Sequence, residues 1–538
     1  MTLLFRCFGN TPFIKAGTGI GVLAGLTLIL AACGGGSSHH GSESSCAARH
    51  GWPSDPLGTD STRHLDASQF ISVNQLKQWH RELDALGLRD TGGPEEDAYI
   101  RTLAGRLDCA GVRDVTLEPV TFPRWSTDDW RLTLNGEPLP VASYIPYSGS
   151  TPEQGVTAPT VYVDITQPVD PSTVAGRIVL FDVPNVTVPT QFFLDNAMQV
   201  WDPLSSFSPD ELYSRPYLAI DAVTRTLDAL GNTEAVGAIG ILQMPYETAH
   251  GSYFPYDGII RQVPALYVDR DLGAQLKGLS NGTELTLRLP AKVADTTTHN
   301  VVAMIPGASD EITVIHSHTD GTNGLEDNGP DAIIGIAQYL ARLPQSALPR
   351  TVMVMFSSGH FAGGVGIKGF LQQHADDDLL DRIKSIITVE HLGAQRWEPD
   401  SNGILQPTGL DELACFFAPR IPSLADAAYR ASEAADAGPV IISAPLNPDA
   451  DAGKHEAVWP GEGQYFYSHN KMSDANYITG PNYLLNWGVD TVEKTDFQRV
   501  HALMMAFTRM VLDLSEVPGE DLSAPSATNG ETIAPPEH

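Results

Sequence analysis

The stretch NVVAMIPGASDEITVIHSHTDGTNGLEDNGPDAIIGIAQYL, residues 300–340, decides the fold of this chain. It contains two short apolar runs, Val301–Ile305 and Ile312–His316, whose β-branched residues are typical of strands. From Ala332 the apolar residues recur at helical spacing, and Pro344 stops that pattern. Two strands followed by a helix predict one unit of a sheet that is covered by helices.

The same alternation continues along the chain. Strands are expected at Thr351–Phe356 and Ile383–Val389, and a final helix is expected at Phe497–Leu514. Earlier in the chain, apolar residues between Ile71 and Leu107 have helical spacing in two segments, with Asp-Thr-Gly-Gly-Pro between them. The sequence therefore predicts an α/β protein with three layers, α/β/α, around a mostly parallel, mixed central sheet.

A second unit interrupts this pattern between Thr160 and Lys292. The runs AGRIVL at 175–180 and AVGAIG at 235–240 resemble a core strand and a helix-to-strand turn of the protease-associated domain. The resemblance implies a smaller, β-rich α/β domain, inserted over residues 158–295, that covers a site and selects substrates rather than performing chemistry.

The expected organisation has five parts. They are a leader over 1–33, a flexible tether over 34–66, an α/β domain built from 67–157 and 296–516, the inserted domain over 158–295, and a loose acidic tail over 517–538. The leader ends in Leu30-Ala31-Ala32-Cys33, which resembles the lipobox of bacterial lipoproteins. That resemblance implies acylation of Cys33 and a membrane-anchored protein of the bacterial cell envelope, facing the periplasm or the exterior. The alternative is an ordinary signal peptide.

Charge and cysteine content limit the possible partners, disulfides and metal sites. With 33 basic and 65 acidic residues the formal net charge is −32, which argues against nucleic acid as a partner. Outside the leader and its Cys33, three cysteines remain: Cys46, Cys109 and Cys415. An exported protein can form one disulfide from these, and Cys46 with Cys109 is the favoured pair. Any metal would need His and carboxylate ligands, because three scattered cysteines cannot supply a thiolate site.

Candidate metal ligands follow three expected strands. His318-Thr319-Asp320 comes directly after the strand that begins at Ile312, and Glu326-Asp327 follows in the next loop. The next two strands end at Gly359-His360 and at Glu390-His391. Open α/β sheets bind ligands at the carboxyl ends of their strands, and imidazole and carboxylate are the ligands that Zn²⁺ takes where no thiolate is available. The set predicts a zinc site, although each residue alone is compatible with a purely structural role.

Together with the run NVVAMIPG at 300–307 and DTVEK at 490–494, these motifs resemble metallopeptidase family twenty-eight, the zinc aminopeptidases and carboxypeptidases. In that family a protease-associated domain is often inserted before the His-x-Asp strand, as the order of parts predicts here. The resemblance implies two zinc ions held by a His, a bridging Asp, a Glu, an Asp and a late His. It also implies a general-base Glu directly before the ligand Glu.

Residue by residue, the resemblance makes His318 a metal ligand, Asp320 the carboxylate that orients it, and Asp327 the bridging ligand. Glu390 takes the place of the later Asp ligand. Two departures affect the rest of the site. The paired Glu residues of the family fall on Gly359 and His360, so the base is missing. Asn486 stands where the late His is expected, and an amide oxygen is a poor zinc ligand.

These departures predict one zinc ion rather than two, with His318, Asp327 and Glu390 as the surviving site and His360 and Asn486 as weaker ligands. Asp320, His360 and Glu326 are the expected catalytic residues, with His360 or Glu326 as the substitute base. His455 and His469, in loops near Asn486, are alternatives for the late ligand.

Three functions are open at this point. The first is a lipid-anchored hydrolase that cleaves a peptide or other amide bond, with a peptide or small amide as substrate. The second is a catalytically degenerate relative that binds a ligand at the cell surface. The third is a metal-dependent hydrolase of non-peptide amides or esters, which the same site would serve.

Overall fold

The computed structural model describes residue 46 and residues 50–280, 282–447 and 457–522. The expected leader with Cys33, residues 34–45 and 47–49 of the tether, His455 and the tail beyond 522 lie outside the described residues. Within the described part, no helix is both long enough and apolar enough to cross a membrane. Two large sheets organise the chain, one of nine strands and one of eight.

The nine-stranded sheet is the central layer of the larger unit, in the order β1-β13-β15-β14-β16-β21-β19-β20-β8. Its strands are β1 Arg113–Ser126, β8 Ala197–Trp201, β13 Lys292–Ile305, β14 Ile312–His318, β15 Thr351–Ser357, β16 Ile383–Val389, β19 Ala414–Phe417, β20 Val440–Ser443 and β21 Asp474–Thr479. In the middle, β14 pairs in parallel with β15 and β16, and β16 pairs in parallel with β21. The outermost pairs, β1 with β13 and β8 with β20, are antiparallel.

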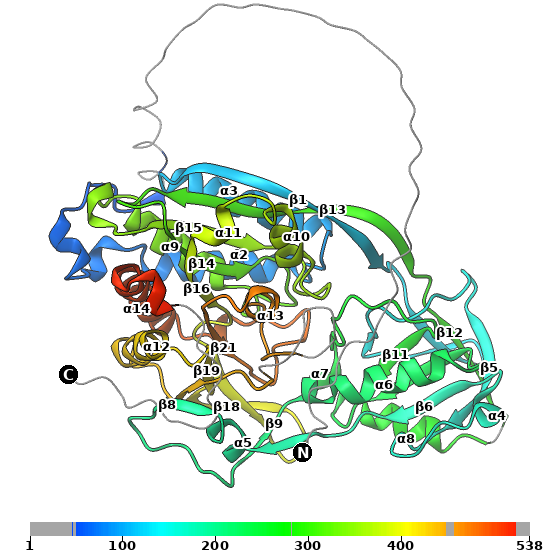
Figure 1. Cartoon of the computed structure of the whole chain (residues 1–538). Coiled ribbons are helices and arrows are strands. Elements are labelled where there is room, and N and C mark those ends of the chain that lie inside the picture. Colours follow the sequence, from blue (N-terminus) through cyan, green and yellow to red (C-terminus); the bar gives the residue numbers. More distant parts are fainter. Residues whose placement is uncertain (1–45, 47–49, 281, 448–456, 523–538) are drawn as a thin grey trace, which may run out of the picture.

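Helices cover both faces of this sheet (Figure 1). One face carries α2 Val73–Leu86, α3 Pro94–Cys109, α9 Gly329–Leu340, α12 Pro422–Ala434 and α14 Phe497–Glu516, and the other carries α10 Val365–Gln373, α11 Leu379–Arg382 and α13 Gln464–Asn470. Successive residues of β14 serve the two cores, since Val314 packs under α10 and Ile315 packs under α9. The predicted three-layer α/β/α architecture is confirmed.

The eight-stranded sheet forms the second unit, to the right in Figure 1, in the order β3-β2-β12-β5-β6-β10-β11-β4. Its strands are β2 Arg131–Leu134, β3 Glu137–Leu139, β4 Ser143–Tyr144, β5 Val156–Tyr162, β6 Ile178–Asp182, β10 Gly237–Ile241, β11 Ala265–Val268 and β12 Glu284–Arg288. The helices α4 Pro171–Val174, α6 Ile220–Gly231, α7 Tyr246–Ala249 and α8 Arg270–Lys277 accompany it. Its buried residues make a separate hydrophobic core.

The two sheets divide the chain differently from the expected bounds. β2, β3 and β4 belong to the second sheet although they precede residue 158. Conversely, β8 lies inside 158–295 but pairs antiparallel with β20 and so completes the edge of the central sheet. Pairing satisfies an edge that would otherwise expose unpaired backbone groups, which explains why this segment leaves the second unit. The flanking segment carries α5 Gln191–Leu194 and a small sheet of β7 Thr187–Pro189 and β9 Leu212–Ser214.

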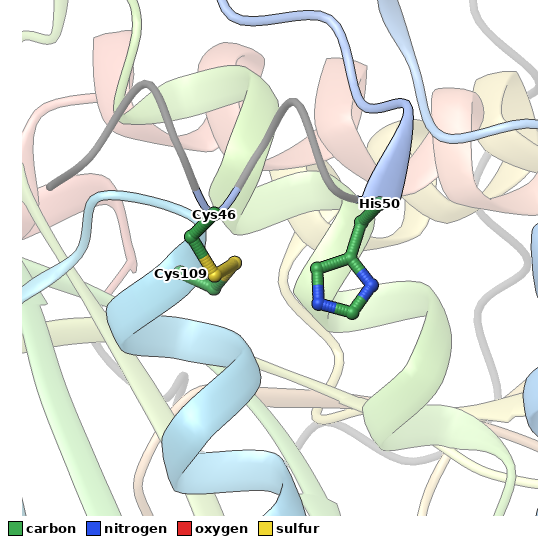
Figure 2. Close-up of side chains that lie close together, drawn as sticks. All are labelled: Cys46, His50 and Cys109. Carbon is green, nitrogen blue, oxygen red and sulfur yellow. A yellow bond between two sulfur atoms is a disulfide. The ribbon is translucent and has the colours of Figure 1, made fainter.

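The predicted disulfide is present. Cys46 and Cys109 are bonded, with 5.5 Å between their Cα atoms, and the bond fastens the start of the described chain to the end of α3 (Figure 2). His50 lies beside it, its ring packed against Trp52. Because both sulfurs are used in the disulfide, this Cys–His group is not a metal site. Cys415 is buried as a free thiol.

Candidate metal centre

Three neighbouring parallel strands bring the candidate residues together. His318 ends β14, Ser358 to His360 follow β15, and Glu390 and His391 follow β16. Because β14 lies between the other two strands, their carboxyl ends meet at one edge of the sheet. All of these side chains are buried. The loop that leads into α9 adds Glu326, so His318, Glu326, His360, Glu390 and His391 form one cluster, called the five-residue cluster below.

His318 stands at the middle of this cluster. Its Nδ1 lies 2.9 Å from the backbone oxygen of Asp320, so Nδ1 carries the proton and Nε2 is left as the ligand atom. Nε2 lies 3.5 Å from Oε2 of Glu390. Burial alone would lower the pKa of His318, but the charges of Glu326 and Glu390 raise that pKa well above its usual range. The imidazole is therefore held in a strongly anionic pocket.

Four buried atoms of the cluster have no hydrogen-bond partner: His318 Nε2, Glu326 Oε2, Glu390 Oε2 and His391 Nε2. Unpartnered buried polar atoms are rare in folded proteins, and four that converge need an explanation. Ligand atoms of His318, His360 and Glu390 lie within 4.8 Å of one another, as do those of His318, Glu326 and His391. Nitrogen and carboxylate oxygen suit zinc, and two carboxylates balance a divalent charge. The residues present fit a zinc ion.

Glu390 is held in place by groups that leave one oxygen free. Its Oε1 accepts hydrogen bonds from the backbone N–H of Glu462 at 3.0 Å and from Nδ2 of Asn476 at 2.7 Å. Burial tends to raise the pKa of Glu390, but the contact with His318 lowers it to about 2. The carboxyl is therefore ionised at neutral pH, as a metal ligand must be.

His360 is oriented by a carboxylate that the sequence did not single out. Its Nδ1 lies 2.8 Å from Oε2 of Glu462, a buried residue in the loop before α13. The ring stacks against that of His318 with 4.4 Å between centroids, and its Nε2 lies 3.8 Å from Glu326. A carboxylate that accepts Nδ1–H fixes the ring and leaves Nε2 with a lone pair.

The carboxylate of Asp320 is 4.0 Å from Nδ1 of His318, too far for a hydrogen bond to the ring. It binds backbone groups of a neighbouring loop. It accepts hydrogen bonds from the backbone N–H groups of His360 at 3.1 Å and Phe361 at 2.8 Å, and from the hydroxyl of Thr91 at 2.6 Å. The expected orienting residue therefore fixes the turn that carries His360. It orients His318 through its backbone oxygen.

The structure does not bring Asp327 into the cluster. Both carboxylate oxygens of this expected bridging ligand are bound by Arg89, with Nε to Oδ2 at 2.7 Å and Nη2 to Oδ1 at 2.5 Å. Both side chains are fully buried. Burial raises the pKa of Asp327 to about 6, although Arg89 opposes that rise.

Asn486 is likewise directed away from the cluster. Its Nδ2 donates to the backbone oxygens of Thr248 at 3.1 Å and His250 at 2.8 Å, in the second unit. The residue ties the late loop to that unit. His469, the other described alternative, is an exposed residue of α13.

Gly359 occupies the position that corresponds to the family's base, and its backbone disfavours any side chain. Its φ is +90°, a conformation that disfavours any side chain. An added Cβ would lie 2.3 Å from Cγ2 of Val365. The backbone of this turn therefore requires glycine.

Two residues of the site had no clear signal in the sequence. Glu462 lies in a Pro- and Gly-rich loop, and Arg89 follows α2 as a single basic residue. His391 stood next to Glu390 at a strand end but was given no role of its own. Only the position of His391 at a strand end could have indicated its role.

An apolar pocket of about 250 Å³ opens onto the cluster. Glu326, His360 and His391 form its polar end. The rest is mostly aromatic and aliphatic, including Phe192, Phe193, Tyr213, Tyr217, Leu413, Phe417 and Ile478. None of its lining residues, which all belong to the described part of the chain, is a Lys or an Arg.

Comparisons with known proteins identify relatives of this fold. Three solved structures share the fold: an aminopeptidase from Aneurinibacillus sp. strain AM-1 (TM-score 0.53, 16% identity, 89% of this chain and 99% of that one), a zinc aminopeptidase from Bacillus subtilis (0.57, 14%, 84% and 98%) and a family-twenty-eight peptidase precursor from Shewanella amazonensis (0.58, 17%, 87% and 98%). The resemblance to metallopeptidase family twenty-eight is confirmed.

Sequence comparison adds a relative of the same kind. Carboxypeptidase Q of Bos taurus is 22% identical over 316 residues, 54% of this chain. The match spans 59% of that relative's length. No family model matches the chain. At these identities the likeness to the solved zinc aminopeptidases establishes the zinc-peptidase fold, and the chemistry has to be argued from the five-residue cluster.

Proposed function

We propose that this protein is a zinc-dependent hydrolase that cleaves a peptide or other amide bond. The observation that carries the proposal is that four buried, unpartnered ligand atoms lie around His318, whose ligand atom is within 4.8 Å of Glu390 in one group and of Glu326 and His391 in the other. His318, Glu326, Glu390 and His391 would hold the ion. A zinc ion bound there would polarise a carbonyl and make a water molecule more acidic.

His360 is proposed as the proton acceptor. With Nδ1–H donated to Glu462, its Nε2 has a free lone pair, and the residue lines the pocket. Burial lowers the pKa of His360, but Glu462 and Glu326 bring it above the ordinary value, which strengthens the ring as a base.

The pocket supports an apolar substrate group. An aromatic lining favours a leucine-like or aromatic side chain next to the scissile bond. Because the described lining has no Lys or Arg, it offers no cation to pair with a C-terminal carboxylate, which favours cleavage at the amino end of a peptide. Tyr217, Ile220 and Tyr256, from the segment expected as a protease-associated domain, line the pocket and support a substrate-selecting role for that domain.

The test combines metal content with turnover. The full chain in detergent is analysed for zinc by mass spectrometry, and hydrolysis of leucine and glutamate p-nitroanilides is measured with and without a chelator. We expect about one zinc per chain, chelator-sensitive hydrolysis, and preference for leucine. His318→Ala should lose both zinc and activity, whereas the matched variant His64→Ala, at an exposed position, should keep both. A zinc-free protein that still hydrolyses these substrates would contradict the proposal.

A second candidate, a surface binding protein without catalysis, is favoured by Gly359, which cannot supply the family's base. It predicts zinc binding without turnover of any amide or ester in the screen. Binding of an apolar peptide that survives chelation would support it over the hydrolase.

The location is proposed as the bacterial cell envelope, with a lipid anchor at Cys33. The disulfide between Cys46 and Cys109 supports an oxidising compartment. Cys33→Ser should move the protein from the membrane fraction to the soluble fraction. An unchanged distribution would contradict the anchor.

A further inference from the structure

We propose that Arg89 takes the place of a second metal ion, so that the centre binds one ion without Asp327. This inference rests on the proposed function only in assuming that the five-residue cluster binds zinc. It differs from the arrangement that the sequence resemblance implied, in which Asp327 bridges two ions.

Every N–H group of the Arg89 guanidinium donates a hydrogen bond. Besides the two bonds to Asp327, Nη1 donates to the backbone oxygens of Leu83, at 3.2 Å, and Gly87, and Nη2 donates to that of Asn323 at 2.6 Å. All five N–H groups of the side chain therefore have acceptors. Arg89 is also fixed through its backbone, which pairs with Gly321 in both directions at 2.9 and 3.1 Å. A side chain held at this many points is built into the fold.

The bidentate pair removes the reason for Asp327 to bind a cation. Its negative charge is already compensated by a guanidinium in direct contact, and neither of its oxygens is among the unpartnered buried atoms. Breaking such a buried pair would leave an uncompensated buried charge, which strongly destabilises the fold. A metal ion that bound Asp327 would have to compensate for the loss of this pair.

The remaining ligands can serve one ion only. The two groups of residues able to hold a metal share His318. Since Nδ1 of His318 faces the Asp320 backbone oxygen, both groups depend on Nε2, and a ring nitrogen has one lone pair. Two ions therefore cannot be bound at once through these groups. Glu326 and Glu390 supply the two negative charges that balance a single Zn²⁺.

Two matched amide substitutions test the assignment, with zinc affinity measured by competition against a chromophoric chelator and stoichiometry by native mass spectrometry. Asp327→Asn should still bind one zinc, with affinity within about threefold of the unmodified protein. Glu390→Gln should lose affinity by more than about 100-fold, because even groups that only orient metal ligands contribute about 10–100-fold. If Asp327→Asn loses zinc as Glu390→Gln does, the inference is wrong.

Folding has to be controlled, because Asn at 327 leaves Arg89 without its counter-charge. Circular dichroism establishes whether the variant is folded. The double variant Arg89→Met/Asp327→Leu removes both charges together and should also bind one zinc. Two zinc ions in the unmodified protein would overturn the inference while leaving the hydrolase proposal intact, whereas no zinc at all would overturn both.

Discussion

At the scale of single residues, His391 is the proposed zinc ligand that has a left-handed backbone conformation. Its φ is +55°, which is uncommon for a residue other than glycine and is often found at functional sites. Two hydrogen bonds to Thr479 hold this conformation, from Nδ1 to the backbone oxygen at 2.6 Å and from the Thr479 hydroxyl to the His391 oxygen at 2.7 Å. The result is that Nε2 faces Glu326 at 3.5 Å.

We therefore expect His391→Ala to weaken zinc binding by more than about 10-fold, since it removes a ligand and the loss should reach at least the range seen for orienting groups. Chelator competition measures the affinity. His64→Ala is the matched control because His64 is exposed. Zinc affinity unchanged in His391→Ala would show that this imidazole serves the fold alone.

Glu462 should act on His360 without binding the ion. Glu462→Gln keeps the shape of the side chain but removes the negative charge that faces Nδ1 at 2.8 Å. We expect zinc to be retained and kcat to fall by about 10–100-fold with little change in KM. The pH–rate profile should also move, because the charge of Glu462 raises the pKa of His360. Loss of zinc in this variant would instead make Glu462 part of the metal site.

Sequence reasoning reached the residues at strand ends and failed where a long-range contact decides the role. His318, His360 and Glu390 follow strands, so strand order alone brings them together. Whether Asp327 is free depends on Arg89, which is 238 positions away in the chain. No local pattern records such a contact.

At the scale of elements, the turn after β15 determines whether a general base can stand at position 359. Gly359 combines a φ of +90° with a Cβ position 2.3 Å from Val365. Restoring the family's base with Gly359→Glu should therefore not restore a paired-Glu site. We expect it to destabilise the protein by about 2–4 kcal/mol, from backbone strain and overpacking together.

Urea unfolding followed by circular dichroism measures this loss, and Gly136→Ala is the control. Gly136, between β2 and β3, has a φ of +85° but no atom within 4 Å of an added Cβ, so it reports strain alone, about 1 kcal/mol. Equal losses at the two positions would show that the Val365 contact is unimportant.

Element prediction was good where periodicity was clear. The two helices between Ile71 and Leu107 are α2 and α3, and the four expected strands from Val301 to Val389 correspond to β13, β14, β15 and β16. The other half of the sheet, β19, β20, β21 and β8, was not predicted. Apart from β21 these strands have only four or five residues, and β8 precedes β19 by about 200 residues, so their apolar runs are too short and too scattered to form a clear pattern in the sequence.

At the scale of the whole molecule, the site depends on contacts between the two sheets. Asn486 binds backbone oxygens of the second unit, and the pocket wall includes residues from both units. The segment that carries β7 and β9 supplies Tyr213 to this wall, and β8 then anchors the same segment to the central sheet. The shape of the pocket is therefore a property of the assembled chain and could not follow from any one motif.

The buried carboxyl of Glu96 links the elements beneath the site, and it should make the stability of the whole fold depend on pH. Glu96, in α3, accepts hydrogen bonds from Thr298 of β13 at 3.1 Å and from Thr319 and Ser358, after β14 and β15, at 2.9 and 2.6 Å. Burial, with a smaller effect from Asp320, raises its pKa to about 8.

Between pH 4.5 and about 8 this carboxyl is protonated in the folded protein and ionised in the unfolded chain. Its contribution to stability is therefore fully present below pH 4.5 and is lost as pH rises through about 8. Glu96→Gln mimics the protonated form, so its Tm should fall less than that of the unmodified protein between pH 6 and pH 9, by about 3 °C or more. Calorimetry of both proteins with zinc removed excludes metal-linked effects. Parallel Tm curves for the two would mean that Glu96 is ionised in the fold, and that its hydrogen-bond donors outweigh the cost of burying the charge.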